Sequence, residues 1–148
     1  MRRLTAVLLL LAGALMAAPP LVLTFDQIKA EPNPERRARM AIDFAILVER
    51  DAEAAYTRND LEVLGAQLKT VTEAVELADS SFEASHKTPG RNPAPYKYAE
   101  LRSRELLVRM NDLQKKMDSE ERAIIDPAIA RVQAIHDEWF EGIMGRKR

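Results

Sequence analysis

The two histidines of the chain are the first residues to consider for metal chemistry. Glu83-Ala84-Ser85-His86 places a carboxylate and an imidazole three residues apart, the spacing at which both project from one helix face toward a metal ion. The other histidine lies in Gln133-Ala134-Ile135-His136, where an amide replaces the matching carboxylate. Glu83 and His86 are therefore the candidate metal ligands, and the alternative is a solvated histidine near a helix end.

Positive charges and tyrosines gather in and just after the proline-rich stretch 88–95. Guanidinium and ammonium groups bind phosphates and carboxylates. We therefore expect this corner to bind an anionic group, such as a phosphate, a carboxylate or a lipid head group, or to contact a partner. The alternative is a surface balanced by nearby acids. The candidate residues are Lys87, Arg91, Tyr96, Lys97, Tyr98 and Arg102.

Several classes of catalysis lack the residues that they need. The chain has no cysteine, which excludes disulfides, thiolate metal sites and a cysteine nucleophile. The sequence contains no serine-hydrolase elbow, Walker loop, dinucleotide-binding glycine motif or zincin motif. The formal charge of −1 argues against a general nucleic-acid-binding protein. We therefore expect a non-enzymatic protein without a cofactor, which acts through macromolecular interaction with a protein partner or by self-association. The alternative is a bundle that binds a small ligand or a metal.

The first 18 residues have the features of a secretory signal peptide. Met1-Arg2-Arg3 supplies positive charge, the run 4–18 contains no charged residue, and small residues crowd its end. The alternative is an uncleaved membrane anchor over residues 4–23, although Pro19-Pro20 interrupts that span. We expect an exported protein, periplasmic or secreted, that meets a membrane only if this segment remains attached.

Helical periodicity begins after a proline-rich start to the mature chain. Residues 19–33 show no sustained period, and we expect a flexible lead-in with one short helix around Phe25–Lys29. A long helix is predicted from Pro34 to about Arg58, with Asn33 as its N-cap. Alanines recur along its apolar face, which predicts that neighbouring helices approach it closely.

The second long helix has the most regular pattern in the chain. Between residues 61 and 82, apolar side chains recur at alternating steps of three and four, as in the seam of a coiled coil. Asn59 is its expected N-cap, and Gly65 indicates a close helix crossing. The short connection at 59–60 forces the first two long helices to run antiparallel.

Two more helices are predicted in the C-terminal half. The loop 88–95 is stiffened by prolines, and Gly90 is expected to supply any positive φ that it needs. A third helix is predicted from about Pro95 to Met117. After a short turn at 119–125, the last helix is expected to begin at Pro127 and to end near Ile143; the alternative is that Pro127 is a kink inside a longer helix.

These elements predict an all-α fold. We expect an antiparallel up-down bundle of about four helices over residues 34–145, followed by a basic tail at 146–148. Strong helix formers dominate the composition, and no strand pattern competes with the helical periodicity. One bundle domain is the organisation that this length and pattern favour.

Three stretches of the chain resemble known groups of proteins. Residues 55–61 resemble the helix–turn–helix junction of a tetratricopeptide repeat. Residues 117–122 are similar to the helix-start motif of periplasmic helical stress chaperones. The whole chain, with residues 100–102 and 141–145 as distinctive stretches, looks like small uncharacterised exported helical proteins of bacteria. That likeness implies the compartment and the helical fold.

Overall fold

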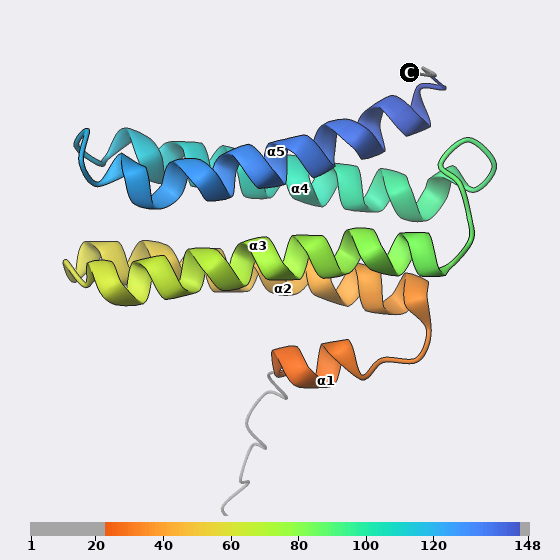
Figure 1. Ribbon diagram of the computed structural model, residues 1–148, viewed down its shortest axis with the longest axis horizontal. Coiled ribbons are helices and arrows are strands. Elements are labelled where there is room, and N and C mark those ends of the chain that lie inside the picture. Colours follow the sequence, from red (N-terminus) through yellow and green to blue (C-terminus); the bar gives the residue numbers. More distant parts are fainter. Residues whose placement is uncertain (1–22, 146–148) are drawn as a thin grey trace, which may run out of the picture.

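The computed structural model describes residues 23–145, and this part of the chain is all-helical, as predicted. The predicted signal peptide 1–18 and basic tail 146–148 lie outside the described residues, as does all but the last residue of the alternative anchor 4–23. No helix within 23–145 has both the length and the apolar character of a membrane span. The helices of this part of the chain are α1 (Phe25–Lys29), α2 (Pro34–Thr57), α3 (Leu61–Ala84), α4 (Pro93–Lys115) and α5 (Arg122–Ile143), as labelled in Figure 1.

The start of α2 is the one that its sequence predicts. The side chain of Asn33 accepts a hydrogen bond from the Arg36 N–H at 3.0 Å, and Pro34 occupies the first helical position.

The cap of α3 differs from the prediction. Asn59 adopts a left-handed φ of 58° and ends the preceding turn, while the Asp60 side chain accepts from the Val63 N–H at 3.1 Å. Asparagine tolerates the left-handed region better than most residues, which explains the exchange of roles.

The last helix begins earlier than predicted. α5 starts at Arg122, so Pro127 lies inside it rather than at its first position. Asp118 and Glu121 form a reciprocal cap before the helix: the Asp118 carboxylate accepts the Glu121 N–H at 2.8 Å, and the Glu121 carboxylate accepts the Asp118 N–H at 3.1 Å. Pro127 is the sixth residue of α5, so it lies beyond the first turn, and the helix lacks the backbone hydrogen bond that another residue would donate there to the carbonyl of Ala123.

The short helix predicted around Phe25–Lys29 is present as α1. Thr24 and Gln27 form a capping box, which closes the first turn of α1. The ring of Phe25 stacks on Phe44 of α2 with centroids 5.4 Å apart, and Ile28 is buried. α1 is therefore capped at its start and packed against α2.

The four long helices form two antiparallel hairpins, α2–α3 and α4–α5, that stack in the same orientation (Figure 1). α2 packs on α4, and contacts advance in the same direction along both, from Asp43–Arg102 to Glu53–Lys116. α3 packs on α5 in the same parallel sense, from Glu76–Arg131 to Asp79–Trp139. The up-down alternation is retained, but two of the four seams join parallel helices.

This topology explains the long connection between the hairpins. α3 and α4 are consecutive in sequence, but α4 packs mainly on α2 and α5. The loop at 85–92 therefore crosses the end of the molecule, from one hairpin to the far side of the other (Figure 1). It turns at His86, whose φ is 55°, and not at Gly90 as predicted.

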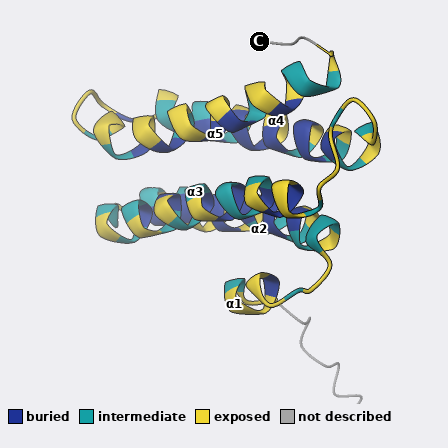
Figure 2. Ribbon diagram, turned by 45° about the vertical axis from the view of Figure 1, so that its right-hand side comes forward, coloured by how far each residue is buried: buried dark blue, intermediate teal, exposed yellow. Residues whose placement is uncertain are grey.

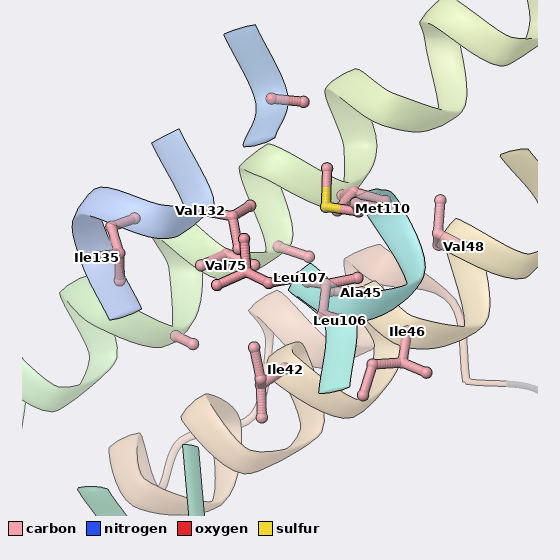
Figure 3. Close-up of a cluster of buried hydrophobic side chains, with 14 of the residues drawn as sticks. Ile42, Ala45, Ile46, Val48, Val75, Leu106, Leu107, Met110, Val132 and Ile135 are labelled. Atoms are coloured by element: carbon pink, nitrogen blue, oxygen red, sulfur yellow. The ribbon is translucent and has the colours of Figure 1, made fainter. Parts of the chain in front are cut away.

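The core lies between the two hairpins. Figure 2 shows the buried faces of the long helices turned toward one another, with exposed residues outside. Every long helix contributes to the core, and most residues of the predicted apolar faces are buried. Figure 3 shows its centre, where the labelled side chains meet: Ile42, Ala45, Ile46, Val48, Val75, Leu106, Leu107, Met110, Val132 and Ile135.

Two helical glycines have different surroundings. A methyl group in place of the Gly65 hydrogen would lie 3.8 Å from Cγ2 of Ile124, an ordinary contact, so the predicted close crossing is absent there. A methyl group at Gly142 would lie 2.7 Å from Cγ of Pro89 in the crossing loop. Gly142 is therefore the glycine that permits a close approach, and Gly145, with a φ of 67°, ends α5.

Candidate binding groove

The most distinctive surface feature is a groove where the N-terminal ends of α2 and α4 lie side by side. Its volume is about 580 Å³, and it is open to solvent on one side. Apolar groups form much of its wall, and two arginines lie at its edge. We call it the arginine groove; its lining residues are Asn33, Glu35, Arg36, Arg39, Phe82, Ala94, Pro95 and Tyr98.

A chain of contacts fixes one of these arginines. The Arg39 guanidinium lies 4.1 Å from the centroid of the Tyr98 ring, in cation–π contact. The Tyr98 hydroxyl donates to the Asp43 carboxylate, with distances of 2.8 and 2.7 Å to its two oxygens. Asp43 in turn accepts from Nε of Arg102 at 2.8 Å. Burial and the hydrogen bond to Asp43 raise the pKa of Tyr98, and Arg39 partly offsets this rise.

The remaining charges of the groove leave it positive. Arg36 is 71% exposed and makes a 3.3 Å ion pair with Glu31, a surface pair of small energetic value. Glu35 is the only acid among the lining residues, and Lys87 neutralises it in an ion pair. An incoming anion therefore meets two arginines whose present partners are weak or aromatic.

The predicted basic corner divides into three roles. Tyr98 lines the groove, Arg102 supports it through Asp43, and Lys87 neutralises Glu35. Tyr96 is unavailable to a ligand, because it is 6% exposed, stacks on Phe82 and donates its hydroxyl to the Lys87 carbonyl at 2.8 Å. Arg91 and Lys97 are exposed on the loop and on α4.

Sequence reasoning missed the other half of the groove, which α2 and α3 supply. Arg36 and Arg39 lie in the first turns of α2, where acidic residues are usually favoured by the positive end of the helix dipole. Two arginines at the N-terminal end of a helix were the sequence feature that could have indicated this half of the groove. Phe82 was predicted correctly as a core residue, but its position at the groove depends on how the hairpins stack.

The candidate metal ligands do not share a helix face. α3 ends at Ala84, and the left-handed φ of His86 takes its side chain off the helix that carries Glu83. Both side chains are exposed. Within residues 23–145, no group of three or more histidine or acidic side chains is placed to hold a metal ion.

The second histidine belongs to a buried polar cluster between α4 and α5. Oγ of Ser103 lies 2.8 Å from Nδ1 of His136, and Nε2 of His136 lies 3.8 Å from the Glu100 carboxylate, which Arg104 also binds. Serine, histidine and carboxylate occur together in hydrolase triads. Here, however, Ser103 is fully buried and its hydroxyl also contacts the Glu100 carbonyl at 3.0 Å, so a substrate has no access to it. The cluster joins two helices.

A second buried acid lies in the α2–α4 seam. Glu49 is fully buried, and Nε of Arg109 binds one of its oxygens, while the other oxygen, Oε1, has no hydrogen-bond partner. Burial raises the pKa of Glu49, and Arg109 only partly offsets that effect. One turn further on, the hydrogen bond from Lys116 lowers the pKa of Glu53. In this seam the charged form of Glu49 is therefore disfavoured, whereas the charged form of Glu53 is favoured.

Comparisons of the chain with protein-family models, with curated proteins and with solved structures found no match.

Proposed function

We propose that this chain is a non-enzymatic exported protein that acts by binding another protein. The observation that carries the proposal is the arginine groove, whose Arg39 is held in place on Tyr98 before any partner arrives. Arginine and aromatic residues dominate the energetics of protein interfaces, and pre-organised side chains lose less entropy on binding. The buried Ser103–His136 cluster and the separated Glu83 and His86 offer no comparable support for catalysis or for a metal site.

The stacking of the hairpins is consistent with such a role. Helix pairs stacked in one orientation are the building principle of helical repeat proteins, which present extended surfaces to partners. Here the same stacking brings the N-terminal ends of α2 and α4 together and so creates the groove. In the predicted up-down bundle α2 and α4 would lie diagonally across the core, so their N-terminal ends would share one end of the bundle without packing against each other.

Export is the second part of the proposal, and it rests on the sequence of residues 1–18. A basic start, an uncharged apolar run and small residues at its end are the features of a cleaved leader. Mass spectrometry of the protein recovered from fractionated cells tests it. We expect a mature form that lacks the leader in an exported fraction; the intact chain in the cytoplasmic fraction would contradict export.

Site-specific photocrosslinking tests partner binding. Ala94 lines the groove and is exposed, so a photoreactive amino acid at this position reports what enters it. We expect a discrete crosslinked protein, identified by mass spectrometry, that is absent when the same probe replaces Arg58, an exposed residue at the other end of α2. A labelled Ala94 position that yields no protein adduct, or the same adducts as position 58, would overturn the proposal.

A further inference from the structure

We propose that the arginine groove binds a short acidic segment of its partner, with a carboxylate on Arg39 and a neighbouring aromatic side chain against the apolar wall. This inference rests on the proposed function and adds the chemistry that the partner must present. The residues of the groove are far apart in the sequence and form no sequence motif: Arg36 and Arg39 come from α2, Phe82 from α3, and Tyr98 from α4.

The carboxylate is inferred from the state of Arg39. The guanidinium carbon of Arg39 lies over the Tyr98 ring, and the Arg39 side chain is exposed. A planar guanidinium binds a carboxylate through two parallel hydrogen bonds along its nitrogen edge. The Tyr98–Asp43–Arg102 contacts hold the ring over which Arg39 lies.

The aromatic neighbour is inferred from the wall of the groove. Ala94, Pro95 and the Tyr98 ring offer apolar surface beside the two arginines. Phe82 is buried and offers a ligand little surface of its own, but it makes this wall rigid, because it stacks on Tyr96 with ring centroids 4.4 Å apart and meets the edge of Trp139 at 5.6 Å. The Tyr98 ring, which the hydrogen bond to Asp43 orients, is the aromatic surface against which a planar side chain would pack.

A peptide segment fits the groove better than a free small molecule. Sites for small molecules enclose most of their ligand, whereas this groove of about 580 Å³ is open along one side. Arg91 and Lys97 are exposed and close in sequence to the lining residues Ala94 and Tyr98, and their positive charge also favours an acidic segment.

Fluorescence anisotropy with labelled synthetic peptides tests this inference on the mature protein. The probe is a five-residue peptide, Gly-Glu-Phe-Glu-Gly, capped at both ends, and its control replaces both glutamates by glutamine. We expect the acidic peptide to bind at least about tenfold more tightly than the control, and its affinity to fall as salt is raised from roughly 0.05 to 0.5 M. Equal binding of the two peptides would overturn the inference.

Variants assign the binding to the groove. Arg39→Ala is expected to weaken binding about tenfold or more, and Arg39→Lys to recover only part of the loss, because lysine lacks the planar fork. Tyr98→Phe keeps the ring but loses the bond to Asp43, so a smaller loss is expected. Arg58→Ala removes the same charge at the opposite end of α2 and should leave binding unchanged. Equal effects of Arg39→Ala and Arg58→Ala would contradict the assignment.

Competition separates the carboxylate peptide from simpler anions. Unlabelled phenylacetate and inorganic phosphate are added at equal concentrations to the bound probe. We expect weak displacement by phenylacetate and less by phosphate; displacement by phosphate equal to that by the acidic peptide would show a general anion site and overturn the inference. If the Ala94 crosslink identifies a partner while the acidic peptide fails to bind, this inference is wrong and the proposed function stands.

Discussion

The two parallel seams of this molecule are built from different chemistry. The α2–α4 seam is polar, with charged side chains on both helices: Asp43, Glu49 and Glu53 face Arg102, Arg109 and Lys116. The α3–α5 seam has the Glu76–Arg131 ion pair and, in addition, Trp139, which is buried, packs against Phe82 and donates its Nε1–H to Asp79 at 2.8 Å. A polar seam orients side chains with little net stabilisation, whereas an aromatic one contributes mainly stability. The groove lies at the end of the polar seam, where orientation matters most.

The largest expected effect lies in the α3–α5 seam. Trp139→Ala should lower the free energy of unfolding by about 3–5 kcal/mol, because it removes a large buried ring and leaves a cavity. Urea denaturation followed by circular dichroism measures it. Trp139→Phe is the control, with an expected loss of about 1–3 kcal/mol, chiefly from the hydrogen bond to Asp79. A loss below about 1 kcal/mol for Trp139→Ala would remove the energetic contrast between the seams.

The polar seam is best tested through pH. Burial raises the pKa of Glu49 above its ordinary value of 4.5, so the folded protein binds a proton more tightly there than the unfolded chain does. The stability that Glu49 contributes is therefore greatest below its unfolded pKa and is lost as pH rises through its folded pKa.

Glu49→Gln removes this titration while keeping the side chain's shape. From roughly pH 4 to pH 8, wild type should lose stability relative to the variant, by about 1–3 kcal/mol, the cost of a buried charge with an unpaired oxygen. Chemical denaturation at several pH values measures the difference. A gain for wild type over that range would mean that Arg109 more than offsets the burial.

The smallest expected effect concerns Gly65 in the α3–α5 seam. Gly65→Ala should raise the free energy of unfolding by about 0.5–1 kcal/mol, because alanine favours the helix and its methyl group would meet Ile124 at an ordinary distance. Gly142→Ala is the matched control with the opposite sign, since its methyl group would collide with Pro89. Thermal denaturation compares both variants with wild type. Destabilisation by Gly65→Ala would contradict this prediction and support the close helix crossing at Gly65 that the sequence suggested.

Much of the local structure was predictable from residue patterns. The apolar stripes, the Asn33 cap and the short helix at 25–29 each follow from interactions within a few residues, and all are present. The errors also have local causes. Asn59 and Asp60 are both good capping residues, and only the backbone path decides which one caps. Pro127 is compatible with the first position or with an early interior position, and the Asp118–Glu121 cap selects the latter.

The candidate site was predictable only in part. Tyr98 and its basic neighbours were found because they are adjacent in sequence, whereas Arg39 lies more than fifty residues away from Tyr98 along the chain. The burial of Tyr96 also depends on a partner, Phe82, from another helix. Contacts between distant residues follow from the stacking of the hairpins, and the residue pattern of a single helix does not predict that stacking.

The sequence by itself determined which stretches are helical and which face of each is apolar, because helix periodicity and capping are short-range properties. Tertiary structure decided that α2 lies beside α4 and α3 beside α5, since several pairings would have buried the same stripes. That choice of neighbours leaves Glu49 with an unpaired oxygen and sets Arg39 on Tyr98, and the arginine groove exists because of it.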